Sequence, residues 1–150
     1  MRVPSIVSVS FLLAVLALAN PAGAAGKLKV EGAWIRTPPP DAVALAGYAE
    51  LRNSGDAPII VHGASSADFG AVSIHETTEA DGVQRMQALD TVEIAPSANV
   101  VFAPGGKHLM LMRPSRPLSP GAVVKIHLDT NDSDGVDATF IVRDDAPSGH

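Results

Sequence analysis

The sequence has 150 residues, of which 46% are hydrophobic, with a net charge of −5 and no cysteine. Zinc ribbons, iron–sulfur clusters and blue-copper centres all use cysteine ligands, so the composition excludes them. The acidic balance also argues against nucleic acid or an anionic membrane surface as a partner, because both need basic patches, whereas it suits a cation.

Residues 1–24 have the pattern of a signal peptide. Arg2 supplies a basic start, residues 6–19 form an apolar run of 14 residues, and Ala22-Gly23-Ala24 has the small-x-small form of a cleavage site. The run is too short to span a bilayer comfortably, and no second apolar stretch of spanning length follows it. No cysteine follows for lipid attachment. We therefore expect an exported, diffusible protein without stable membrane insertion.

The remaining 126 residues are enough for a single domain with one core. We assign this domain to residues 25–143 and expect a monomer. Residues 144–150 are polar and offer no core residue, so they are expected to form a flexible C-terminal tail. With Arg2 removed, 10 basic residues stand against 16 acidic ones, which leaves a net charge of −6.

Strand signals dominate the chain after residue 24. No helical periodicity is sustained for ten residues, and short β-branched stretches alternate with turns such as Asn53-Ser54-Gly55-Asp56. The expected strands are residues 28–35, 43–52, 58–63, 72–77, 83–89, 91–95, 99–102, 108–112, 123–128 and 138–142. Strands at this spacing predict an all-β sandwich or small barrel.

One hairpin is expected to reverse at Asp81-Gly82, the strongest hairpin signal in the chain. Residues whose numbers sum to 163 then face each other, which pairs Ile74 with Leu89. Met86 becomes the diagonal neighbour of His75, about 7–8 Å away between backbones. If the apolar pair faces the core, His75 and Met86 share the opposite face, and a slip of one residue would destroy this arrangement.

A second segment presents the same two residue types. Strict alternation places Leu109 and Leu111 on one face of a strand, and His108, Met110 and Met112 on the other. The leucine face belongs in the core. The other face then carries an imidazole and a thioether about 7 Å apart, a span that one metal ion can bridge.

Convergence of the two segments would gather His75, Met86, His108 and Met110. Two imidazoles and two thioethers form a neutral, soft donor set that suits Cu(I) better than Zn²⁺, Mg²⁺ or Ca²⁺. Thioethers also survive in an oxidising compartment, where thiolates form disulfides. No acid or base is evident beside these residues, and no Ser/His/Asp signature is recognisable, so we expect a binding protein and not an enzyme.

Other candidates have plainer explanations. Methionine fills gaps in cores, so Met112 is expected to pack, although it could serve as an alternative thioether. His62 and His127 are expected to be structural, and His150 to be solvated on the tail. Glu76, or Glu79 and Asp81 at the turn, could orient an imidazole or attract a cation, but a solvated hairpin tip explains them equally well.

The spacing of the four candidate ligands resembles a known family. His75, ten residues, Met86, twenty-one residues and His108-Leu109-Met110 reproduce the H-x10-M-x21-H-x-M pattern of the PCu(A)C periplasmic copper chaperones. Further similar segments cover nearly the whole mature chain. They are Ala33-Trp34-Ile35-Arg36 with the proline run after it, Ala46-Gly47-Tyr48 leading to Asn53-Ser54-Gly55, Pro104-Gly105-Gly106, and Pro117-Leu118 before Gly121.

The resemblance implies a periplasmic protein with a cupredoxin-like Greek-key β-sandwich that binds one Cu(I) through His75, Met86, His108 and Met110. It also implies delivery of copper toward the CuA centre of cytochrome c oxidase, with the CuA-bearing subunit and a Sco-type assembly protein as partners. A copper storage or tolerance protein with the same ligands is the alternative. Some family members have a long His- and Met-rich C-terminal extension that holds Cu(II). This chain has only His150 after Asp144-Asp145, so a second, strong Cu(II) site is not expected.

Overall fold

A computed structural model describes residues 28–132 and 134–146, so the expected signal peptide and most of the tail lie outside the described residues. The described residues form ten strands and no helix. The strands are β1 (Leu28–Arg36), β2 (Ala44–Asn53), β3 (Ile59–Ser65), β4 (Phe69–Ala80), β5 (Val83–Ala88), β6 (Val92–Ile94), β7 (Asn99–Phe102), β8 (Lys107–Pro114), β9 (Val123–Thr130) and β10 (Val136–Arg143). Each of the ten expected strands is present, and β4 extends three residues beyond its expected bounds at both ends.

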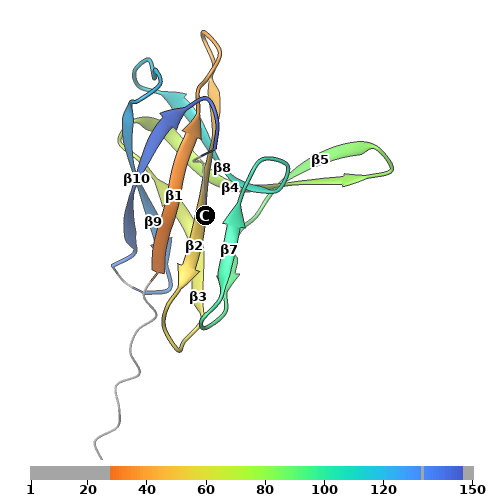
Figure 1. The fold of residues 1–150 in the computed structure, drawn as a ribbon, viewed down its shortest axis with the longest axis vertical. Coiled ribbons are helices and arrows are strands. Elements are labelled where there is room, and N and C mark those ends of the chain that lie inside the picture. The colour runs from red at the N-terminus through yellow and green to blue at the C-terminus, as the bar shows by residue number, and fades with distance from the viewer. Residues whose placement is uncertain (1–27, 133, 147–150) are drawn as a thin grey trace, which may run out of the picture.

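The strands form one continuous sheet that closes on itself. Neighbours follow the order β5-β4-β8-β2-β1-β10-β9-β3-β6, with β7 also paired to β2. Within this order, β4 and β3 are the first and last strands of the series β4-β8-β2-β1-β10-β9-β3. These two strands also pair with each other, through Ala64 and Val72, which closes the series. β1 and β10 run parallel, whereas the other pairs are antiparallel (Figure 1). The chain is a closed, single-domain β-sandwich, which confirms the predicted fold class.

Alternation along the strands builds the core. In β9 the side chains of Val124, Ile126 and Leu128 are at most 1% exposed, and Phe140 of β10, opposite Val124, is fully buried. From the other side, β4 contributes Ile74, and β8 contributes Leu109 and Leu111, each at most 3% exposed. The leucine face of β8 therefore faces inward, as the alternation predicted, and its other face is available for polar and sulfur-bearing side chains.

The core allows a simple test of packing. Replacing Ile126 with Val removes one methylene from a fully buried position on β9, on the side of the sandwich away from β5. We expect the free energy of unfolding to fall by about 0.5–1.5 kcal/mol, measured by urea denaturation. The control Val123→Ala alters a side chain that is 53% exposed and should stay within about 0.5 kcal/mol of the parent. Equal losses in both variants would contradict the assigned core.

The β4–β5 hairpin extends away from the body of the sandwich (Figure 1). It reverses at Asp81 and Gly82, whose φ angles of 54° and 73° are both positive. Two consecutive positive φ values are typical of the type I′ turn, which matches the twist of its strands and fixes their register. The pairs of β4 and β5 run from His75–Ala88 to Ala80–Val83. The residue numbers of each pair sum to 163, so the predicted register of the hairpin is confirmed.

Candidate metal centre

Three neighbouring strands carry the four candidate ligands. β4 lies between β5 and β8, and His75 of β4 pairs directly with His108 of β8. Met110 lies opposite Ser73. Met86 lies opposite Thr77.

Pairing also decides on which face each side chain lies. Directly paired residues point to the same face of a sheet, and so do residues two apart along one strand. Ser73 and Thr77 are each two residues from His75 on β4, so they lie on the same face as His75. The cross-strand partners of these three residues, which include Met110, Met86 and His108, lie on that face as well. The two strand segments therefore do converge, and all four candidate ligands lie on one face.

The spacing of the ligands is compatible with a single ion. Met86 and Met110 are diagonal neighbours of His75, at about 7–8 Å between backbones. The ring centroids of His75 and His108 are 5.9 Å apart, with a 36° angle between the ring planes. A metal ion lies about 2 Å from a ligating imidazole nitrogen, so two rings that share one ion have centroids about 5–6 Å apart, depending on the angle at the ion.

Exposure changes steeply across this face. The side chain of His108 is buried at 6% exposure, His75 and Met110 are half-buried, and Met86 on the projecting hairpin is 55% exposed. Behind them, the buried side chains of Ile74 and Leu109 form a directly opposed pair. The centre thus has a fixed side built on β4 and β8, and an open side at β5.

The buried histidine is held by the backbone. His108 Nδ1 lies 3.0 Å from the carbonyl oxygen of Gly106, which also accepts a hydrogen bond of 3.0 Å from the amide of Thr77. A carbonyl can only accept, so Nδ1 of a neutral His108 carries the proton. The lone pair of His108 is then on Nε2, which is free to bind a metal ion.

His75 has a different environment. Its Nε2 is 3.0 Å from the hydroxyl oxygen of Ser73, whereas its Nδ1 is buried and has no hydrogen-bond partner within the described part of the chain. Burial, together with the nearby charge of His108, lowers the pKa of His75 below its usual value. A lowered pKa keeps the imidazole neutral at neutral pH, the form that binds metals.

A family comparison assigns the chain to a known family. The family model described as "Putative lipoprotein LpqE-like" matches residues 28–142, which include all four candidate ligands. That family is the family of PCuAC domains. The chain belongs to the PCuAC family. The match also includes every residue of the hairpin and of β8.

Solved PCuAC structures have the same fold. A copper-bound PCuAC domain from PmoF2 is 29% identical, with 81% of this chain and 95% of that chain covered at a TM-score of 0.63. The Cu(I) form of DR1885 from Deinococcus radiodurans is also 29% identical, with 83% and 84% covered at a TM-score of 0.66. A protein of Leifsonia xyli subsp. xyli, named as a lipoprotein, is 29% identical over 126 residues, which are 83% of this chain and 75% of that protein.

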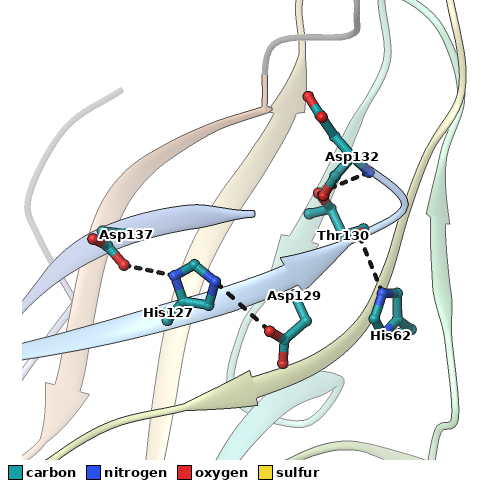
Figure 2. A network of polar contacts seen from close by, with 6 residues as sticks. All are labelled: His62, His127, Asp129, Thr130, Asp132 and Asp137. Atoms are coloured by element: carbon teal, nitrogen blue, oxygen red, sulfur yellow. Dashed lines mark hydrogen bonds and ion pairs between the residues drawn. The ribbon is translucent and has the colours of Figure 1, made fainter. Parts of the chain in front are cut away.

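Two other histidines lie in a separate part of this PCuAC chain, on β3 and β9 (Figure 2). His62 donates from Nε2 to the carbonyl oxygen of Thr130 at 3.1 Å. His127 has Nδ1 2.6 Å from a carboxylate oxygen of Asp137 and Nε2 3.6 Å from one of Asp129. Both rings have structural partners, as the sequence predicted. In residues 28–132 and 134–146, no three His, Asp or Glu side chains are grouped to hold a metal.

Some residues of the centre were not found from the sequence. Ser73 and Gly106 contact the two imidazoles, and neither was selected as a site residue, although Gly106 belongs to the family-like segment Pro104-Gly105-Gly106. Glu76, a candidate to orient His75, instead forms an ion pair of 2.7 Å with Lys107. These two residues pair across β4 and β8 beside the histidines, so their contact supports the register of the two strands.

Proposed function

We propose that this protein is a Cu(I)-binding metallochaperone that holds one ion between His75, Met86, His108 and Met110. The observation that carries this proposal is that all four side chains lie on one face of β5, β4 and β8. Their neutral imidazole and thioether donors favour Cu(I) over harder divalent ions. The Cu(I) form of DR1885 supports the same ion, and the copper-bound PmoF2 domain supports copper as the metal.

We further propose that the protein delivers copper toward the CuA centre of cytochrome c oxidase, with a Sco-type assembly protein as a second partner. The exposed side chain of Met86 favours transfer, because an acceptor can approach the ion from that side. Storage or tolerance through the same ligands is the alternative function. A storage protein is expected to enclose its metal ion, in contrast to the exposed Met86. No catalytic step is part of either proposal.

Export to the periplasm, through the expected signal peptide, completes the proposal. The family and the Leifsonia relative are both named as lipoproteins, a class of exported proteins, which supports export of this chain as well. Across the described ranges, no helix is long and apolar enough to cross a membrane. We expect the protein to act as a monomer.

A transfer assay tests this function. The protein loaded with one equivalent of Cu(I) is mixed with an apo CuA domain, and copper is measured on each protein after their separation. A chaperone is expected to give most of its copper to an equimolar acceptor within minutes. Retention of the copper, with no exchange over hours, would contradict delivery to CuA and favour storage.

A further inference from the structure

The two histidines of the centre present different ring nitrogens. A neutral imidazole has one protonated nitrogen, which donates, and one bare nitrogen, which accepts or binds a metal. At His108 the Gly106 carbonyl selects the tautomer, because it can only accept. At His75 the partner is the hydroxyl of Ser73, 3.0 Å from Nε2, which can donate or accept. Geometry at this one contact therefore allows two tautomers.

The buried nitrogen of His75 distinguishes the two tautomers. If Ser73 donates to Nε2, then Nδ1 carries the proton and becomes a buried donor without an acceptor. Buried N–H groups of this kind are rare in proteins because they lose their hydrogen bond to water. If Nε2–H donates to Ser73, Nδ1 instead offers a bare lone pair. Only this second tautomer leaves no unpaired donor.

A metal ion would supply the missing partner of Nδ1 in the second tautomer. Bound at Nδ1, the ion would use the one polar atom of His75 that the described residues leave unpaired, and the Ser73 hydrogen bond would persist. Bound at Nε2, it would displace Ser73 and leave a protonated Nδ1 buried without a partner. A carboxylate, backbone carbonyl or water usually accepts from the second nitrogen of a metal-binding histidine and orients its ring. The hydroxyl of Ser73 would take this place at His75.

We propose that Ser73 is a positioning residue of the copper centre: it accepts a hydrogen bond from Nε2–H of His75 and so directs Nδ1 of His75, with Nε2 of His108, to the Cu(I) ion. This inference rests on the proposed function and names the ligating atoms. Ser73 also lies opposite Met110, so it adjoins two of the candidate ligands on their face without being a ligand itself.

Nitrogen NMR of the full chain tests the proposal directly. Long-range ¹H–¹⁵N spectra of the ¹⁵N-labelled protein distinguish protonated, bare and metal-bound imidazole nitrogens. We expect Nε2 of His75 and Nδ1 of His108 to be protonated both with and without one equivalent of Cu(I). A Cu(I)-bound Nε2 on His75 would overturn the assignment.

Substitutions supply the second measurement. Ser73→Ala should lower the Cu(I) affinity about 10-fold, within the range found for outer partners of metal ligands, and should populate both tautomers of His75 in the copper-free protein. Ser73→Thr keeps the hydroxyl and should restore both the affinity and the single tautomer. Ser65→Ala is the matched control, because Ser65 is an exposed serine of β3 that pairs with His127 of β9 and with none of the four candidate ligands.

The outcomes separate this proposal from the copper assignment. If His75→Ala abolishes tight Cu(I) binding but Ser73→Ala changes neither the tautomer nor the affinity, the ligand set stands and the role of Ser73 is wrong. If His75→Ala leaves the affinity unchanged, the ligand assignment itself fails. A thermal unfolding curve of Ser73→Ala that matches the parent would exclude misfolding as the cause of a lower affinity.

Discussion

Met110→Leu is expected to lower the affinity for Cu(I) by at least about 100-fold, since the loss of a direct ligand should exceed the 10–100-fold effect of removing an outer partner. Leucine keeps the apolar volume of methionine but has no sulfur, so the fold should persist while one donor is lost. Met110 is half-buried opposite Ser73, next to both histidines. Competition with a colorimetric Cu(I) chelator measures the affinity.

Met112 supplies the matched control for this substitution. It lies on the same face of β8, two residues further along, but it pairs with Ala71 and Ala44 and not with a histidine-bearing position. Met112→Leu should therefore change the affinity by less than about 3-fold. An equal loss in both variants would show that Met112 is also a ligand. No loss in Met110→Leu would remove Met110 from the ligand set.

The sequence was sufficient for the local parts of this centre. The turn residues Asp81 and Gly82 determine the register of β4 and β5, because few sequences adopt two positive φ values in succession. Alternation determines which side of β8 faces inward, because a leucine face must be buried. Both effects act over a few residues, so each His–Met pair was predicted correctly within its own segment.

The meeting of the two segments depends on a non-local pairing. Three expected strands lie between the β4 and β8 segments in the chain, yet His75 and His108 are direct partners. No turn joins these strands, so the sequence alone does not determine their register. The family spacing of the four ligands was the only signal of their convergence. The role of Ser73 depends on the same register and on a ring orientation, which strand patterns do not contain.

Among Met86, Met110 and Met112, Met86 should be the first to be oxidised. Its side chain is 55% exposed, whereas Met110 and Met112 are half-buried. Limiting peroxide should add an oxygen atom to Met86 first in the copper-free protein, as measured by peptide mass spectrometry. A sulfoxide is a polar group with a hard oxygen donor in place of the soft thioether, so it should bind Cu(I) poorly.

The loss of affinity should follow the modification of that single residue. Protein with Met86 fully oxidised should bind Cu(I) about 100-fold more weakly, comparable to the loss of any other ligand, and methionine sulfoxide reductase should restore the affinity. Met86→Leu should resist the further effect of peroxide because its exposed thioether is already gone. Oxidised protein that keeps its affinity would place Met86 outside the ligand set, and the projecting hairpin would then need a different role.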